Sequence, residues 1–210
     1  WVPNHIYEDW PSSATCGSVT GSCHMKTNNE PQNPSDDHPQ ELSTILDNWQ
    51  NLMRTGMRLC SPASWDGSDY WNGTGFIKTF LDSIDARGWR CDIVDAHGYW
   101  DEGNFNHLKN YWFPNMHRPI WISEWIWGAS WNSNGAFANN VTNAQVLATT
   151  QRILENLNSM TCVERYAYWN SERTAHIYEG NSLTDLGKYY ATMDVGLGYN
   201  PANEFIPRET

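Results

Sequence analysis

Apolar side chains recur along the chain with two different spacings. In four segments they lie three or four residues apart, the period of an amphipathic helix; these segments are residues 41–55, 75–87, 143–158 and 184–192. Nearly continuous apolar runs separate them, which is typical of buried strands; these runs are residues 57–60, 92–97, 119–125 and 163–169. A shorter helical pattern covers 105–112 and is expected to end before Pro114, since proline interrupts a helix.

This alternation of strands and helices predicts an α/β domain with a parallel sheet covered by helices. An open doubly wound sheet and a (β/α)8 barrel of the TIM type both fit such a pattern. An open nucleotide-binding sheet normally carries a glycine-rich phosphate loop after its first strand. Neither GxGxxG nor GxxxxGK[ST] occurs, so the barrel is favoured, as a single catalytic domain spanning residues 1–210.

Composition narrows the kind of ligand. The chain has 13 tryptophans, 14% aromatic residues and a net charge of −11 with only 13 Lys plus Arg. So many aromatic residues exclude a disordered chain, and the scarcity of cations argues against nucleic acid. No run of 18 apolar residues is present, so no membrane span is expected, and no signal peptide is recognised. We expect a neutral or cationic ligand that lies against aromatic faces.

The cysteines and histidines give no metal or cofactor signal. Five cysteines cannot all pair internally, and no CxxC or histidine ligand spacing occurs. Cys16 and Cys23 bracket a small loop and form either a disulfide or a free thiol pair, two alternatives that the sequence leaves open. The other three, Cys60, Cys91 and Cys162, are expected to be buried as small apolar residues. Low charge and an Asn/Trp/Ser-rich composition fit a secreted, periplasmic or cell-surface protein.

Polar residues gather where the predicted strands end. Asn29 and Glu30 follow a short run at 23–27, and Glu124 lies near the end of 119–125. In a (β/α) barrel the carboxyl ends of the strands carry the active site. Two glutamates on separate strands satisfy the need of glycoside hydrolysis for an acid and a second carboxylate. Glu30 alone could cap a helix, and Glu102 and Glu172 are spare carboxylates at the same edge.

Aromatic residues surround these glutamates and are candidates for stacking on sugar rings. The predicted substrate-binding aromatic residues are Trp65, Tyr99, Trp100, Trp125, Trp127 and Trp169. His97 ends the 92–97 strand and joins them as a candidate substrate-binding residue. The substrate predicted from this constellation is a polysaccharide or oligosaccharide.

The motifs resemble those of a known group of enzymes. N-E-P at 29–31 and I-S-E-W at 122–125 resemble the retaining (β/α)8 glycoside hydrolases of clan A. RLCSPAS at 58–64, DIVDAHGYW at 92–100 and RPIWISEW at 118–125 resemble glycoside hydrolase family 128 in particular. That family, also labelled a glycosyl hydrolase catalytic core, cleaves β-1,3-glucan.

The resemblance implies a role for each matching residue. Glu30 would be the general acid/base and Glu124 the nucleophile, with their carboxyl groups about 5–5.5 Å apart. Asn29 would hold the sugar 2-hydroxyl or the nucleophile. His97 and Tyr99 would line the catalytic subsite, and Tyr99 could donate a hydrogen bond to Glu124. Trp169 would form a stacking floor beneath the sugar.

The resemblance also implies three strands before the N-E-P strand, but only 28 residues precede Asn29 and most of them read as loop. We therefore expect the first barrel strands to be absent from this chain, with a second chain or a missing N-terminal segment completing the barrel. Two rival functions remain open. One is a clan A hydrolase acting on another β-glycan such as mannan, xylan or galactan. The other is a carbohydrate-binding barrel without catalysis, against which the Glu30 and Glu124 pair argues.

Overall fold

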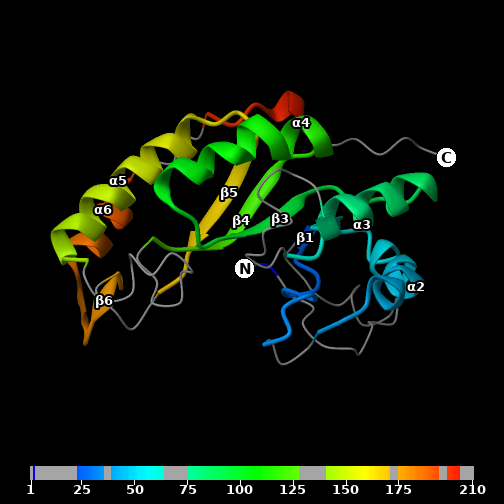
Figure 1. The fold of residues 1–210 in the computed structure, drawn as a ribbon, viewed down its shortest axis with the longest axis horizontal. Helices are drawn as coiled ribbons and strands as arrows, with labels where there is room; N and C mark the ends of the chain where they lie inside the picture. The colour runs from blue at the N-terminus through cyan, green and yellow to red at the C-terminus, as the bar shows by residue number, and fades with distance from the viewer. Residues whose placement is uncertain are drawn as a thin grey trace.

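The computed structural model of the chain describes residues 2, 23–35, 39–63, 75–127, 141–170, 175–193 and 198–203. Strands and helices alternate through most of this part, as Figure 1 shows. In chain order the elements are β1 (His24–Met25), α2 (Leu42–Met53), β2 (Arg58–Leu59), α3 (Gly75–Ala86), β3 (Val94–Gly98), η1 (Glu102–Asn106), η2 (Leu108–Trp112), α4 (Phe113–Met116), β4 (Ile120–Trp125), α5 (Asn143–Ser159), β5 (Val163–Tyr168), β6 (Tyr178–Glu179), β7 (Ser182–Leu183), α6 (Asp185–Thr192) and η3 (Pro201–Asn203).

The first five strands are parallel and lie in the order of the sequence. β1 pairs with β2, and β3 pairs with β4, which pairs with β5. A parallel bridge between Cys60 and Ile93 continues the sheet from β2 to β3. This order, with a helical segment in each crossover, is that of consecutive units of a (β/α) barrel. Within the described residues the sheet does not close, and β1 and β5 are its edges, so the complete barrel remains a prediction.

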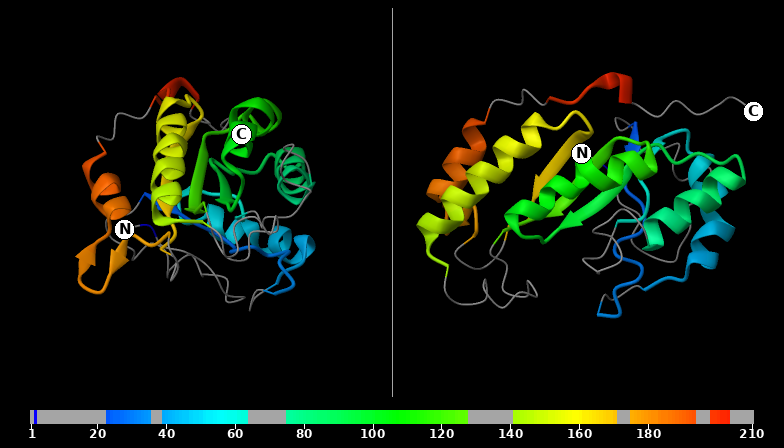
Figure 2. Two further views of the ribbon diagram at one scale, coloured as in Figure 1. Left: turned by 60° about the vertical axis from the view of Figure 1, so that its left-hand side comes forward. Right: turned by 45° about the horizontal axis from the view of Figure 1, so that its top comes forward.

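One face of this sheet carries the main hydrophobic core. Val94 and Ala96 of β3 and Ile120 and Ile122 of β4 are buried there against the helices. The amphipathic stripes of the helices supply the other side of the core, for example through Trp49 of α2, which is fully buried. Figure 2 shows the helices on this face in two further views. The expected helices and strands are present to within three residues at their ends, but β5 is not a buried strand: only Val163 is buried, and Arg165 and Ala167 are exposed.

The opposite face, here called the inner face, is more polar. Successive residues of a strand point to opposite sides, so Asp95 of β3 and Ile93 just before this strand lie on the inner face. Ile93 packs with Cys60 and Trp121 in a cluster separate from the main core. Asp95 is fully buried, and its Oδ2 lies 3.8 Å from Nζ of Lys26.

The segment between β3 and β4 differs from the single short helix expected there. A 3₁₀ turn (η1), a π-helical turn (η2) and α4 follow one another. Pro114 lies in the first turn of α4, where its missing N–H costs nothing. The expectation that Pro114 ends the helix is therefore wrong: the chain continues to His117, which ends α4 in a left-handed conformation with φ 52°.

The described part of the chain after β5 contains a hairpin and a short 3₁₀ turn, η3, that the sequence pattern did not predict. β6 and β7 form a two-stranded antiparallel hairpin, visible in Figure 1 below α6. The helix expected at 184–192 is present as α6, capped by the Thr184 hydroxyl. In the described part of the chain, no helix combines the length and the apolar composition needed to cross a membrane.

Candidate active site

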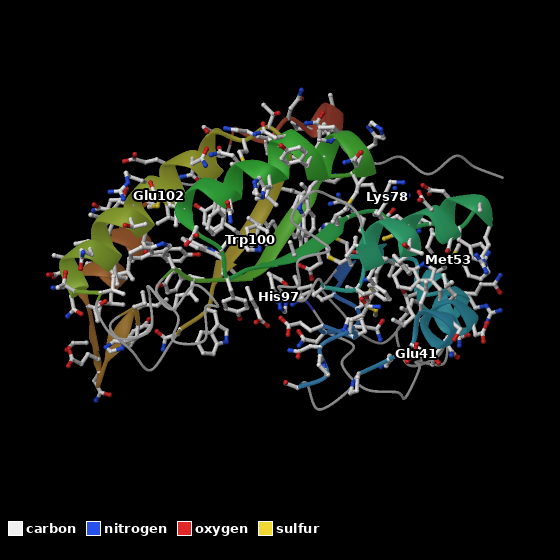
Figure 3. The ribbon with its side chains drawn as sticks, in the orientation of Figure 1. Glu41, Met53, Lys78, His97, Trp100 and Glu102 are labelled. Carbon is white, nitrogen blue, oxygen red and sulfur yellow. The ribbon has the colours of Figure 1, made fainter. Side chains whose placement is uncertain are left out.

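Two of the predicted carboxylates and two predicted neighbours meet at the carboxyl end of the sheet. Glu30 follows β1, Glu124 belongs to β4, and His97 belongs to β3, with Tyr99 just beyond it. In Figure 3 His97 lies on the side of β3 away from the helices, whereas Trp100 lies on the helix side. These four side chains come from three parts of the sheet, β1, β3 and β4, so the fold and not the local sequence brings them together.

His97 lies between the two glutamates. Its Nδ1 is 2.6 Å from Oε1 of Glu30 and 3.6 Å from Oε2 of Glu124. The imidazole is fully buried, so its ring is held by packing. One ring nitrogen therefore contacts one carboxylate and lies close to the second.

Tyr99 holds the second carboxylate from another side. Its hydroxyl donates a hydrogen bond of 2.6 Å to Oε2 of Glu124, as the family resemblance suggested. The Tyr99 ring also meets the His97 ring edge to face, with 6.3 Å between centroids. Gly98 separates the two residues on the chain, and its Cα faces Phe105 and Trp125 closely, which leaves no free space for a side chain.

A β-bulge in β4 turns Glu124 toward His97. Ala96 pairs with Ile122, but the next residue, His97, pairs with Glu124, so Ser123 is an additional residue in β4. Such a bulge changes the face to which the following side chains point. Glu124 thereby lies on the inner face with His97, and Trp125 points into the main core.

Backbone geometry places Glu30 at a sharp turn. Its φ is 34°, a left-handed conformation that is uncommon for a residue with a side chain and that often marks functional sites. The N–H of Asn33 donates to the carbonyl of Glu30 at 2.8 Å, which closes a four-residue turn with Pro31 at its second position. Proline is favoured at that position because its φ is already fixed.

Asn33 is a site residue that the sequence analysis missed. Its Nδ2 donates a hydrogen bond of 2.7 Å to Oε2 of Glu30. The signal available in the sequence was an asparagine three residues after the glutamate, with Pro31 in between. That pattern alone does not distinguish a side-chain contact from an ordinary turn.

The two carboxylates differ in their exposure to solvent. The Glu30 side chain is 11% exposed and that of Glu124 is 28% exposed. Glu30 is thus the less solvated of the two, which is the environment expected for a general acid. Asn29, directly before Glu30, is half-buried.

The predicted aromatic residues fall into two groups. Trp169 is half-buried and meets Tyr99 edge to face, with 6.4 Å between centroids, and Trp127 is half-buried near the same cluster. Trp125, by contrast, is 0% exposed and packs against Phe105 and Tyr168. The prediction that Trp125 binds substrate is therefore wrong, because the bulge directs its ring into the core.

Trp100 requires a similar correction. It is 8% exposed and packs against Phe105 and Trp112, with ring centroids 5.3 and 5.9 Å away. Its indole ring is covered by core residues instead of offering a face to a sugar. Trp65 lies outside the described residues, so its predicted role is not addressed.

The spare carboxylate Glu102 pairs with an arginine outside the site. Glu102 forms two hydrogen bonds with Arg152 of α5, at 2.7 and 2.8 Å, and these hydrogen bonds lower the pKa of Glu102. Glu172 lies outside the described residues.

Cysteine chemistry and metal binding add little to the site. Of the two alternatives for Cys23, the structure has the free thiol, and Cys16 lies outside the described residues. Burial raises the pKa of Cys91 to about 12 and that of Cys162 to about 11, so these thiols stay protonated at neutral pH. Among the residues that the structure describes, no group of three His, Cys, Asp or Glu side chains is arranged to hold a metal ion.

Comparison with known proteins gives a consistent result. Residues 1–190 match a family model described as glycosyl hydrolase catalytic core. An endo-beta-1,3-glucanase of glycoside hydrolase family 128, subgroup I, from Amycolatopsis mediterranei, in complex with laminaritriose and laminaribiose, is 26% identical, with a TM-score of 0.75. The match covers 90% of this chain and 80% of that chain. No curated protein sequence matches.

More distant structures share the fold. A subgroup II endo-beta-1,3-glucanase from Sorangium cellulosum is 18% identical, with a TM-score of 0.69, over 91% of this chain and 79% of that chain. A subgroup VII oligosaccharide-binding protein from Cryptococcus neoformans is 16% identical, with a TM-score of 0.67, over 86% of this chain and 72% of that chain. The fold is therefore shared by proteins described as enzymes and by a protein described as binding oligosaccharides.

Proposed function

Because the chain belongs to the glycosyl hydrolase catalytic core family and is a glycoside hydrolase, we propose that it cleaves β-1,3-glucan with retention of anomeric configuration. Glu30 acts as the general acid/base and Glu124 as the nucleophile. The substrate follows from the similar endo-beta-1,3-glucanases, whose structures contain laminarin oligosaccharides.

The observation that carries this proposal is the position of one His97 nitrogen close to both carboxylates. Its distances to them are 2.6 and 3.6 Å. The distance between the two oxygens that face this nitrogen cannot exceed the sum of these two distances. That sum is below about 6.5 Å, the smallest separation of the two carboxyl groups that is typical of inverting enzymes. This closeness supports nucleophilic attack by a carboxylate.

The surroundings of the two groups support the division of roles. Glu124 accepts a hydrogen bond from Tyr99, which holds its carboxylate in one orientation for attack on the sugar. Glu30, the less exposed side chain, delivers a proton to the glycosidic oxygen while Glu124 bonds to the anomeric carbon and the leaving sugar departs. Glu30 then takes a proton from water, which attacks the same carbon and releases Glu124.

Neutral sugars fit the remaining features of the site. Trp169 and Trp127 are partly exposed near the Tyr99 cluster and can offer aromatic faces to sugar C–H groups. The net charge of −11 disfavours anionic polymers. Mannan, xylan and galactan are the competing neutral substrates.

A second candidate function is oligosaccharide binding without hydrolysis. The observation that favours it is the subgroup VII protein with the same fold, described as an oligosaccharide-binding protein. Hydrolysis is preferred because the side chains of Glu30, His97, Tyr99 and Glu124 form one connected group.

The decisive experiment compares the unchanged protein with Glu124→Gln and Glu30→Gln on laminarin, mannan and xylan. We expect laminarin to be cleaved, each variant to lose at least 100-fold in kcat/KM, and both variants to retain binding of laminarin oligosaccharides. Proton NMR of the first product should show the β-anomer. Glu155→Gln, an exposed glutamate on α5, is the matched control and should keep full activity.

Each outcome separates the alternatives. Binding without products from the unchanged protein would establish the binding function instead. Products from mannan or xylan alone would correct the substrate, and a first product in the α-form would overturn retention. Full activity in Glu124→Gln would refute the assigned nucleophile.

We also propose that the protein works outside the cytoplasm, where a polymeric glucan is accessible. The low content of charged residues, 18%, and the Asn72 and Asn140 glycosylation patterns support this location. Detection of the protein in cells but not in the culture medium or cell envelope of its source would contradict it.

A further inference from the structure

Glu30 has a backbone conformation that its surroundings must hold in place. Its φ of 34° lies in the left-handed region, which costs free energy for a residue with a side chain and persists only where neighbouring groups fix the chain. The hydrogen bond from Asn33 fixes the chain only locally, because both of its ends belong to the turn itself. Contacts from other segments must therefore fix the chain on the two sides of Glu30.

Gln40, in the segment before α2, contacts the chain on both sides of Glu30. Its backbone N–H donates a hydrogen bond of 2.8 Å to the carbonyl oxygen of Pro31, the residue directly after Glu30. Its side-chain Oε1 accepts a hydrogen bond of 3.0 Å from Nδ2 of Asn28, which precedes Glu30. One residue thus bridges the chain across Glu30.

Asn28 itself is held by the part of the chain that follows β2. Its carbonyl oxygen accepts a hydrogen bond of 2.8 Å from the N–H of Ala63. The hydroxyl of Thr27, the residue before it, donates to the carbonyl oxygen of Cys60 at 3.1 Å. These contacts fix the position of Asn28 relative to the sheet, and Gln40 relates the position of Pro31 to it.

The side chains of Asn28 and Gln40 are buried, but their hydrogen-bonding groups are only partly satisfied. In the described part of the chain, Oδ1 of Asn28 and Nε2 of Gln40 have no hydrogen-bond partner. A buried polar atom without a partner costs free energy, and two apolar side chains of the same shape would avoid this cost. An apolar pair would not supply direction, whereas a hydrogen bond holds its two groups within a limited range of angles. The pair is therefore better suited to orienting the chain than to stabilising the fold.

We propose that Gln40 is a positioning residue, which fixes the backbone of Glu30 through Asn28 and Pro31 and thereby places the Glu30 carboxyl group for its reaction with the substrate. The inference rests on the proposed role of Glu30 as general acid/base. Gln40 adds no chemical step and acts through the main chain. A displacement of about 1 Å at a catalytic group can cost roughly 100-fold in rate, so a small change in this turn is enough to slow the reaction.

His97 and Asn33 provide a competing explanation for the position of Glu30. They contact the two oxygens of its carboxyl group at 2.6 and 2.7 Å. If these contacts were sufficient, the turn could loosen without any effect on the reaction. The two explanations differ in the result expected when the amide pair is removed and the carboxyl contacts remain.

The test replaces the two amides with apolar side chains of nearly the same shape. Gln40→Met and Asn28→Leu each remove one amide and keep the backbone N–H and carbonyl groups. The double variant leaves no buried amide without its partner, so we expect its free energy of unfolding to be close to that of the unchanged protein. Gln50→Met, at an exposed glutamine on α2, is the matched control.

The first measurement is independent of activity. Amide hydrogen exchange, followed by NMR, reports how often the hydrogen bonds from Gln40 to Pro31 and from Asn33 to Glu30 open. In Asn28→Leu we expect both amides to exchange at least about tenfold faster, while the amides of β4 keep their rates. The control Gln50→Met should leave all of these rates unchanged.

The second measurement compares two leaving groups. Laminarin needs a proton on its leaving oxygen, whereas a 2,4-dinitrophenyl laminarioside releases its leaving group without one. In the double variant we expect kcat/KM to fall roughly 10- to 100-fold on laminarin and to stay within about twofold on the activated substrate. A general loss of structure would lower both values alike. Binding of laminarin oligosaccharides, measured with Glu124→Gln added to prevent cleavage, should be unchanged.

The outcomes separate this inference from the proposed function. Unchanged exchange in Asn28→Leu overturns the bridging role of Gln40, whether or not the protein cleaves glucan. Unchanged kcat/KM on laminarin in the double variant shows that His97 and Asn33 position Glu30 without Gln40, and equal losses on both substrates also overturn the inference. If the double variant does not fold, Gln40→Met alone is compared on the two substrates by the same criteria. If the unchanged protein cleaves neither substrate, the proposed function fails, and the exchange rates still decide whether Gln40 fixes the turn.

Discussion

Arg58 and Glu164 form a two-point ion pair that joins β2 to β5 across the inner face, although β3 and β4 lie between these strands in the sheet. Nη1 and Nη2 of Arg58 lie 2.9 and 3.0 Å from Oε1 and Oε2 of Glu164. Nη1 also lies 2.9 Å from Nε2 of His24 on β1. The ion pair can form only if the sheet is curved, so it stabilises the curvature.

Removing one partner of this pair is expected to destabilise the fold. The two side chains are 21% and 13% exposed, so Glu164→Gln leaves the Arg58 charge mostly buried without its counterion. We expect the free energy of unfolding to fall by about 2–4 kcal/mol at pH 7. Urea denaturation measures this, with the exposed Glu155→Gln as control, and a loss no greater than in the control would contradict the prediction.

The same pair predicts how stability depends on acid. Burial raises the pKa of Glu164, but hydrogen bonds and charge from Arg58 outweigh it and hold the pKa below its usual value. An acid whose pKa is lowered in the folded state makes its full contribution to the stability of the fold at pH values above its ordinary pKa. This contribution is lost as the pH falls through the lowered pKa. The stability difference between the unchanged protein and Glu164→Gln should therefore shrink below about pH 4. A gap that widens in acid would contradict this assignment.

Asp92 should show the opposite dependence. Burial is the main cause of its raised pKa, in spite of the hydrogen bond that Oδ2 accepts from the N–H of Leu59 at 2.7 Å. An acid whose pKa is raised in the folded state destabilises the fold progressively as pH rises from its ordinary pKa to the raised value. Asp92→Asn keeps an acceptor oxygen without the charge and should be at least as stable at pH 7, whereas Asp92→Ala should lose about 1–3 kcal/mol. The thermal unfolding temperatures of Asp92→Asn and Asp92→Ala, measured from pH 3 to 8, distinguish these two effects.

Tyr99→Phe tests the hydrogen bond to the proposed nucleophile. Loss of a donor to a charged group is expected to lower kcat/KM on laminarin roughly 10- to 100-fold with little change in stability. Tyr178→Phe, at a tyrosine that is 56% exposed on β6, is the control and should be fully active. Equal activity of the two variants would show that the 2.6 Å contact contributes nothing to the reaction.

Gly98→Ala tests the packing between His97 and Tyr99. An added methyl group would lie 3.1 Å from Phe105 Cε1 and from Trp125 Cβ, and 3.3 Å from Ile122 Cγ2. Overpacking of this degree is expected to cost about 1–3 kcal/mol and to lower activity by displacing both site residues. Unfolding and laminarin assays measure the two effects, and Gly103→Ala, where a methyl group meets nothing within 4 Å, is the control.

The periodic patterns predicted the repeating part of the fold well. α2, α3 and α5 bury the apolar stripes that the sequence displays. Each stripe covers one face of its helix, so the spacing of apolar residues is enough to predict the helix. The pattern failed where a local rule was overridden. Pro114 was expected to end a helix but begins one, since the preceding residues form a π-helical turn and not a continuous α-helix.

At the candidate site, chain order was enough to identify Glu30, His97, Tyr99 and Glu124 as neighbours. It was not enough for Trp125, whose direction depends on the bulge, or for Asn33, whose role depends on a turn and an amide orientation. Both require knowledge of the backbone path, which residue identities alone do not supply.

The bulge at Ser123 has a consequence for how the site can change. Ser123 makes β4 one residue longer than its neighbours over the same stretch. The number of residues in β4, and not the type of residue at position 123, therefore determines the face of the sheet to which Glu124 points. Substitutions at Ser123 preserve that count, whereas a single deletion there would shorten the path to Glu124 by about 3.3 Å and draw its carboxylate back from His97. β4 can therefore accept substitutions at Ser123 more readily than it can accept a change in its length.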